Sequence, residues 1–321
     1  ALVDRSLLQR TSTGHYALHE LLRQYAAEKL GASEEKTRAA HDRHAAYYAA
    51  AIQRWAQDLK GDRDRVAQIE IEAEFEDVRA AWEWALERGE VGWLDQAQEG
   101  LFLFCWYRRR FADGEAMNGA AAAALETQEA GSPACAGTLR VLSKLLAAQS
   151  WFWGETFDRP GARELAQRSV ALLERDELVD QDVRFERAFA WLVQVRSLGR
   201  IHGATVDLDY AEASELWKRS RALFQALGER LWMGRSLNVW GIVSAYIYGD
   251  WVGAKDRLEQ ALAICRTLRN DFGAEGARME LAGVVGHLGQ FEEAVRLYRQ
   301  LLAMRQDGSE ADIAGAFLGI G

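Results

Sequence analysis

The sequence predicts an all-α protein, most of it a solenoid of helical hairpins. Three observations lead to this prediction. The 321 residues include only two prolines, against an average usage of about 5%, and helix formers such as Ala, Leu, Glu and Arg dominate. Hydrophobic residues make up 49% of the chain, which is ample for a folded core. Finally, helical segments recur with a period of about 40 residues, as stacked helix pairs do.

The first 31 residues have a pattern of their own. Ser6–Gln9 and His15–Ala17 read as two short strands around a polar Thr-Ser-Thr-Gly turn. The segment that follows has apolar residues at helical spacing, which predicts an amphipathic helix. The apolar residues of this helix are Leu18, Leu21, Leu22, Tyr25 and Ala26.

The same helix contains the beginning of a zinc-protease motif. In H-E-x-x-H, two histidines one turn apart bind a metal ion and the glutamate acts as general base. His19 and Glu20 fit the first two positions, but Arg23 stands where the second histidine would be. We therefore expect no catalytic metal here, and packing or hydrogen bonding by His19 instead.

This N-terminal string resembles the wing and last helix of the winged-helix domain in NB-ARC-type signal-transduction ATPases, the STAND class. The matching residues are Ser6, Leu7, Leu8, Tyr16, Leu18, His19, Glu20, Leu21, Leu22, Arg23, Tyr25, Ala26 and Leu30. The resemblance implies that residues 1–31 are the C-terminal part of a winged-helix domain with a short β-wing. It also implies that His19 can contact a bound nucleotide in the full-length protein.

Residues 32–95 are predicted to form a helical linker, which resembles the segment that joins this module to a repeat sensor. His41 and His44 lie three residues apart on one of its helices, a spacing that a metal ion could bridge. No third ligand is evident nearby, so a solvated helix face is the preferred interpretation. The acidic run Glu70–Asp77 is interpreted in the same way.

Residues 96–321 are predicted to be a helical-repeat superhelix, truncated at its C-terminus. Gly249 aligns with Gly289, and the same alignment places Ala254 over Ala294. In each unit a turn with Gly or Asp separates two helices, and a small Ala lets them approach closely. The repeats resemble the long-period tetratricopeptide repeat of bacterial sensor arrays, well over Phe185–Arg305 and weakly before it.

In a tetratricopeptide array the first helix of each pair lines the concave surface. Side chains opposite the packing stripe of these helices are therefore the candidate ligand-binding residues. They mix cations, amides and aromatic rings, as a groove for a peptide or a small polar ligand does. The candidates are Lys144, Trp151, Arg187, Trp191, Gln194, Arg235, Asn238, Tyr246, Met279 and His287. The alternative is that most of these aromatic residues pack against neighbouring helices.

The net charge of −9 argues against a general affinity for nucleic acid phosphates. Three separated cysteines fit a reducing cytoplasm, and no apolar run is long enough for a membrane span. No phosphate-binding G-x-x-x-x-G-K-[ST] loop occurs. ADP or ATP with magnesium is thus expected only with an upstream nucleotide-binding domain of the same chain, and no cofactor is expected in this fragment.

The leading hypothesis is a non-enzymatic sensor fragment of a STAND ATPase. It would bind an inducer, whether protein, peptide or small molecule, on its concave face and relieve autoinhibition of the upstream module. The alternative is a tetratricopeptide scaffold that joins partners without a nucleotide-coupled switch. An enzyme has little support because no nucleophile and base, paired acids or metal set stands out.

Overall fold

The computed structural model describes residues 8–10, 16–131, 135–155, 159–198 and 208–304. Within these ranges the chain is all-helical apart from one short hairpin, so the predicted all-α class is confirmed. The strands are β1 (Leu8–Arg10) and β2 (Tyr16–Leu18). The helices of the first half are α1 (Glu20–Gly31), α2 (Glu34–Leu59), α3 (Asp64–Ala73), α4 (Phe75–Arg88), α5 (Val91–Tyr107), α6 (Phe111–Gly131) and α7 (Ala136–Trp153). Those of the second half are α8 (Arg159–Leu172), η1 (Asp176–Leu178), α9 (Arg184–Ser197), α10 (Tyr210–Ala226), α11 (Arg230–Tyr246), α12 (Trp251–Leu268), α13 (Asp271–His287) and α14 (Phe291–Met304).

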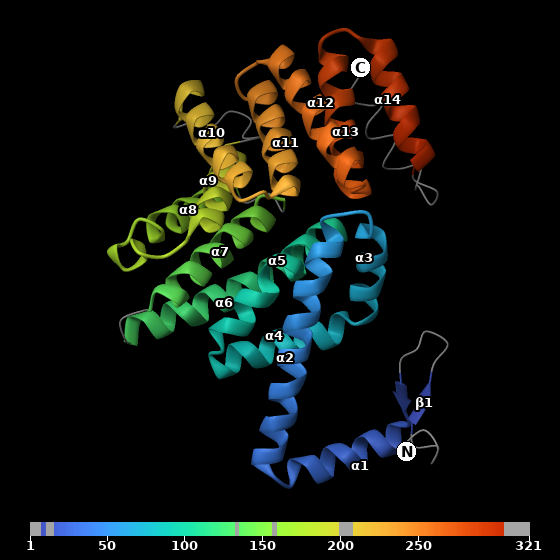
Figure 1. The fold of residues 1–321 in the computed structure, drawn as a ribbon, viewed down its shortest axis with the longest axis vertical. Coiled ribbons are helices and arrows are strands. Elements are labelled where there is room, and N and C mark those ends of the chain that lie inside the picture. The colour runs from blue at the N-terminus through green and yellow to red at the C-terminus, as the bar shows by residue number, and fades with distance from the viewer. Residues whose placement is uncertain (1–7, 11–15, 132–134, 156–158, 199–207, 305–321) are drawn as a thin grey trace.

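The predicted helical repeat is present. From α5 onward each helix packs on the next one in the chain, and the first helices α5, α7, α9, α11 and α13 also pack on one another in succession. Gly249 and Gly289, which the sequence aligned, both have φ of 75° and end the first helix of their pair in the same way. Ala254 and Ala294 are both fully buried. These helix pairs follow one another around the molecule in Figure 1.

The N-terminal hairpin and α1 extend away from the array. β1 pairs antiparallel with β2, with Leu8 opposite Leu18, one to two residues beyond the predicted strands. Residues 1–7 and 11–15, with the remainder of the predicted strands and their turn, lie outside the described residues. No residue of α1 is buried, and Leu21 is 69% exposed. The helix packs on the start of α2, at the lower end of Figure 1.

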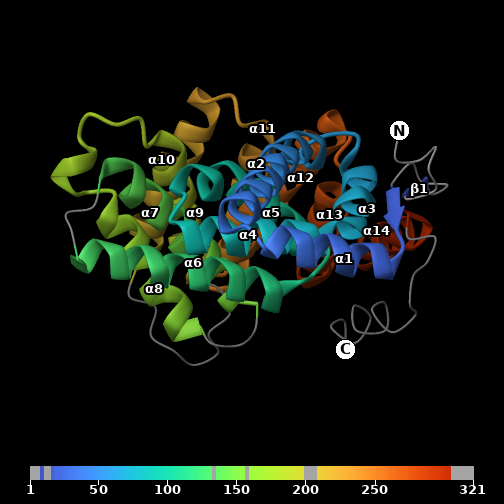
Figure 2. The ribbon, with the colours of Figure 1, turned by 90° about the horizontal axis from the view of Figure 1, so that it is seen from below.

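Helices α2, α3 and α4 form a compact unit with α5. Helix α2 packs along both α4 and α5, and α3 contacts α4 and α5. Seen from below, in Figure 2, α6 and α8 lie on one side of the array and α10 and α11 on the other. No helix among the described residues is both long and apolar enough to span a membrane.

The corner between α2 and α3 contacts the last part of the array. Buried Asn270, the N-cap of α13, accepts a hydrogen bond from the Gly273 N–H at 2.7 Å and donates to the Leu59 carbonyl at 2.8 Å. The buried Asp64 carboxylate accepts the Phe272 N–H at 2.9 Å. In an ideal solenoid each unit contacts only its neighbours. Here the array is closed, because its beginning is bonded to a helix pair near its end.

Removal of the Asn270 side chain should open this closure. Asn270→Ala removes a helix cap and leaves the buried Leu59 carbonyl without its donor, so we expect unfolding to become easier by about 2–4 kcal/mol. Urea unfolding followed by circular dichroism measures this change. The control is Ser33→Ala, which removes only the cap of α2 at the Lys36 N–H and should cost about 1 kcal/mol. Equal losses for the two variants would contradict a joining role for Asn270.

Burial raises the pKa of the Asp64 carboxyl, although the N–H groups of Phe272 and Arg65 act in the opposite direction. A carboxyl whose pKa is raised on folding stabilises the fold below its unfolded pKa of about 3.9, and this contribution is lost as pH rises through the folded pKa. The stability of the protein relative to Asp64→Asn should therefore fall as pH rises from 3 toward neutrality. Urea unfolding of both proteins over this range tests the sign. A wild-type protein that gains stability relative to Asp64→Asn as pH rises would contradict it.

Candidate functional site

The ten candidate ligand-binding residues do not form one open groove. Three of them are buried inside the array: Trp151 is 1%, Arg235 4% and Lys144 8% exposed. Four are partly buried, namely Arg187, Trp191, Gln194 and Asn238. Three are exposed near the end of the array, namely Tyr246, Met279 and His287.

The inner faces of the first helices meet in an aromatic cluster centred on Phe102 of α5, which is 1% exposed. Its ring lies 5.6 Å from Trp151 of α7 and 5.3 Å from Phe189 of α9, between ring centroids. Trp232 of α11 lies at 5.8 Å. Aromatic rings at these separations and tilts attract one another beyond their burial. The concave side of this tight superhelix is therefore filled by its own side chains, and we call Phe102, Trp151, Phe189 and Trp232 the inner cluster.

Beside the inner cluster, α5 and α7 are joined by charges that are buried or half-buried. The Asp95 carboxylate accepts hydrogen bonds from Lys144 and from Arg140. Arg140 also donates to Glu186 of α9 at 2.8 Å, so the charges link three first helices. Burial acts to raise the pKa of Asp95, but Lys144 and Arg140 outweigh it and hold that pKa below its usual range. Lys144 is thus an internal ion-pair partner.

A second ionic contact ties α11 to the N-terminal half. Lys60, at the end of α2, lies 2.7 Å from Glu99 of α5 and 3.2 Å from Glu229, the residue before α11. The indole N–H of Trp232 donates to the same Glu99 carboxylate at 2.8 Å. The half-buried Lys60 therefore has two partners of opposite sign, which offset the cost of taking its charge partly out of water.

Arg235 of α11 is buried in an aromatic surrounding. Its guanidinium carbon lies 4.0 Å from the centre of the Trp106 ring, with Phe272 at 5.2 Å and Tyr107 at 5.8 Å. Trp106 also packs edge-on against Trp151, with ring centroids 5.0 Å apart. The array thus brings two of the predicted residues, Trp151 and Arg235, into contact with one partly buried tryptophan.

The candidates on α9 lie elsewhere. Arg187 donates to the Leu173 carbonyl at 3.1 Å, in the connection between α8 and α9. Trp191 is covered by Arg219 of α10, whose guanidinium carbon lies 4.2 Å above the indole. Gln194 accepts a hydrogen bond from the Ser197 hydroxyl at its main-chain carbonyl. Arg187 and Trp191 thus contact the α8–α9 connection and the second helix α10.

At the far end, α11, α12 and α13 contribute a partly exposed aromatic group. The His287 ring stacks on Trp251 with centroids 4.3 Å apart, and Tyr246 meets both rings edge-on. The ring nitrogen Nδ1 of His287 is 3.0 Å from the Gly283 carbonyl. Met279 is exposed, and so are Val252 and Phe291 on the second helices of these two pairs. This end therefore exposes several large apolar side chains to solvent.

The histidines considered for metal binding have other partners. His19 is the N-cap of α1, and its Nδ1 accepts the Leu21 N–H at 3.3 Å. Its neighbour Glu20 pairs with Arg23, the residue that interrupts the zinc-protease motif. His41 stacks on Trp84, and His44 approaches Asp77 at 3.3 Å. Among the described residues no three His, Cys, Asp or Glu side chains are grouped so as to hold a metal ion.

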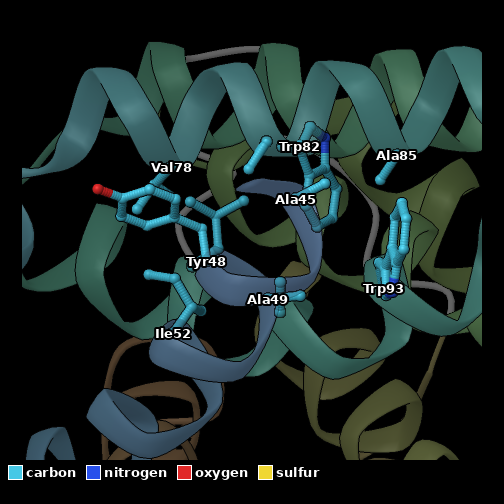
Figure 3. Close-up of a pocket in the computed structure, with 11 residues that line it drawn as sticks. Ala45, Tyr48, Ala49, Ile52, Val78, Trp82, Ala85 and Trp93 are labelled. Carbon is cyan, nitrogen blue, oxygen red and sulfur yellow. The ribbon is translucent and has the colours of Figure 1, made fainter. Parts of the chain in front are cut away.

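An apolar pocket lies between α2, α4 and α5, shown in Figure 3. Tyr48, Trp82 and Trp93 frame it, with several alanines on its walls. Two of its polar groups are already engaged, since Trp82 donates to the Met117 carbonyl and Tyr48 donates to Glu74. The cavity volume is ≈ 10 Å³, which is room for about one water molecule. It is too small for an organic ligand and is best described as imperfect packing.

Several residues at the centre of the array are absent from the sequence-based candidates. They are Asp95, Phe102, Trp106, Tyr107, Glu186, Arg196 and Phe272. One signal was available, because the run Leu101–Tyr107 is the most apolar stretch of the chain and has to be buried on several sides. Its partners could not be inferred, since they come from helices about 50 to 170 residues away in sequence, which only the superhelix brings together.

Comparison of the sequence with protein-family models and with curated proteins gives no match. The functional interpretation therefore rests on the residues themselves and on the resemblances described above.

The ionic link at Asp95 should be essential to the array. Asp95→Asn leaves the buried Lys144 ammonium with only Glu186, 3.9 Å away, and we expect a loss of about 2–3 kcal/mol of unfolding free energy. Glu72→Gln is the matched control, because Glu72 pairs with Arg108 and Arg110 near the surface and such pairs contribute about 1 kcal/mol or less. Urea unfolding compares the two, and a smaller loss for Asp95→Asn would contradict an essential link.

Proposed function

We propose that this chain is the ligand-sensing part of a STAND-type signal-transduction ATPase, and that it has no catalytic activity of its own. Its repeats would be tetratricopeptide-like, and its N-terminal hairpin and α1 would be the end of a winged-helix domain. The resemblance of residues 1–31 and the helical-repeat architecture support this proposal. Its partners would be an inducer and an upstream nucleotide-binding domain in the same chain, within the cytoplasm, without direct contact to nucleic acid or membrane.

The single observation that carries the proposal is the closure of the array on itself. Asn270 and Phe272 at the start of α13 are bonded to Leu59 and Asp64 at the α2–α3 corner. The inner cluster fills the space that an open tetratricopeptide groove would offer. This arrangement supports a closed resting form. An inducer that binds the open form more tightly would shift the population toward it, and that difference in affinity is the source of the signal.

The N-terminal segment is suited to transmit such a change. Helix α1 buries none of its residues, and exposes Leu21 and Tyr25. An exposed apolar stripe of this kind supports contact with a further domain. His19 is exposed at the start of the same helix, where the resemblance implies a contact with nucleotide. Helix α1 would therefore join the array to the nucleotide-binding domain, with ADP or ATP and magnesium bound there.

A scaffold without a nucleotide switch is the second candidate. The exposed side chains Val252, Met279 and Phe291 favour it, because they offer an apolar surface to a protein partner near the end of the described array. The two functions differ in one measurable property. Only a sensor requires that opening of the array changes the rate at which bound nucleotide dissociates.

The closure variant distinguishes them in the full-length protein. Asn270→Ala weakens the closed form, so we expect a fluorescent ADP analogue to dissociate faster, on the order of tenfold. Stopped-flow fluorescence at a temperature below unfolding measures the rate, and Ser33→Ala is the control expected to leave it unchanged. Equal rates for the wild type and Asn270→Ala would favour the scaffold. A full-length protein that binds no nucleotide would contradict the STAND assignment.

A further inference from the structure

The two residues that flank Trp106 carry buried donors without acceptors. Within the part of the chain that the structure describes, Nε and Nη2 of Arg235 and Nε1 of Trp151 have no hydrogen-bond partner. The side-chain amide nitrogen of Asn238, one helical turn beyond Arg235 on α11, also has no hydrogen-bond partner among these residues. All these atoms are donors. Buried polar groups are nearly always paired, so a group of unpaired donors calls for an explanation.

Arg235 differs from the buried Lys144 and the half-buried Lys60. Lys144 has the Asp95 carboxylate and Lys60 has Glu99 and Glu229. Arg235 makes no ion pair among the described residues. The nearby buried acid, Asp64, accepts the main-chain N–H groups of Arg65 and Phe272 instead. The Arg235 charge is therefore balanced by the faces of aromatic rings and by a hydrogen bond to the Tyr107 side chain, which attract a cation less than a carboxylate does.

Trp151 differs from two other buried tryptophans, Trp232 and Trp217, and shares its unpaired indole N–H with Trp240. The indole N–H of Trp232 donates to Glu99, and that of Trp217 donates to the Ser236 carbonyl. A buried indole normally has such a partner. The N–H of Trp151 has none within the described residues, although its ring contacts Trp106, which also lies under Arg235.

We propose that the space around Trp106 is the inducer site of the array, and that it takes a small organic carboxylate with an apolar body. This inference rests on the proposed sensor function and deepens it. The Arg235 guanidinium would bind the carboxylate oxygens through its free Nε and Nη2 atoms, a fork that matches a carboxylate in geometry and charge. Trp151 and Asn238 would donate at the edge, while Trp106 and Phe272 cover the apolar body.

The burial of this site favours a small ligand over a protein segment. Arg235 and Trp151 are almost completely covered, while Trp106 retains some exposure. Entry therefore requires Trp106 to move or the array to open at the Asn270 corner. Since a carboxylate reaches the donors only when the array opens, its binding would favour the opened form. The aromatic walls disfavour a small inorganic anion such as phosphate.

The test follows the Trp151 indole N–H by nuclear magnetic resonance in the ¹⁵N-labelled 321-residue chain. Its signal is assigned from the spectrum of Trp151→Phe. Titration with benzoate should shift this signal, and benzamide, which has the same shape without the charge, should bind at least tenfold more weakly. Arg235→Met should reduce benzoate affinity more than tenfold. Arg219→Met is the matched control, since Arg219 also stacks on a tryptophan at 4.2 Å but lies on the outer side.

If Arg235→Met does not fold, Arg235→Lys is tested instead. Lysine keeps the positive charge but lacks the two-pronged guanidinium, so a tenfold loss of benzoate affinity is again expected. Equal binding of benzoate and benzamide would overturn the carboxylate inference while leaving the array a ligand sensor. Phosphate binding as tight as benzoate would overturn it too, as would unchanged affinity in the Arg235 variant. A Trp151 signal unmoved by benzoate would also reject the site, without affecting the proposed function, which the nucleotide-release measurement tests separately.

Discussion

The contact on which the structure depends is the packing of Phe102 against rings from three later helices. Trp151, Phe189 and Trp232 each come from the first helix of a different pair, and all reach the same residue of α5. The first helices can converge in this way only if the superhelix is tightly wound. The tight winding in turn removes the open groove and brings the α2–α3 corner to α13. Fold, closure and candidate site thus follow from one aromatic cluster.

The polar groups of the interior are organised around that cluster. Lys60 and Lys144 are neutralised by carboxylates from other helices, so the inner surface is held by specific ionic contacts as well as by apolar burial. Such pairs contribute mainly specificity, since desolvation offsets much of their attraction. Arg235 is the exception, because it has aromatic faces in place of an acid. Arg235 is therefore the buried cation on which the ligand proposal rests, together with the unpaired donors of Trp151 and Asn238.

The local structure was predictable because it depends on nearby residues. Gly249 and Gly289 end their helices in a left-handed conformation that glycine adopts without strain, and Ala254 and Ala294 pack where the sequence repeat placed them. The position of His19 was also readable, although its role as the N-cap of α1 was not foreseen. The side chains of the concave face were harder to predict. Lys144, Trp151 and Arg235 were chosen as groove residues by helical spacing, yet each is buried against α5.

The sequence by itself determined the helical class, the repeat and the boundaries of its pairs, because helix propensity, turn glycines and apolar spacing act within one or two turns of chain. Only the tertiary structure decided which inner faces meet. The curvature of a solenoid accumulates from small rotations between units, and no local pattern encodes their sum. That sum brings both Trp151 and Arg235 to Trp106, and so decides whether a cation on an inner helix faces solvent, a carboxylate or a ring.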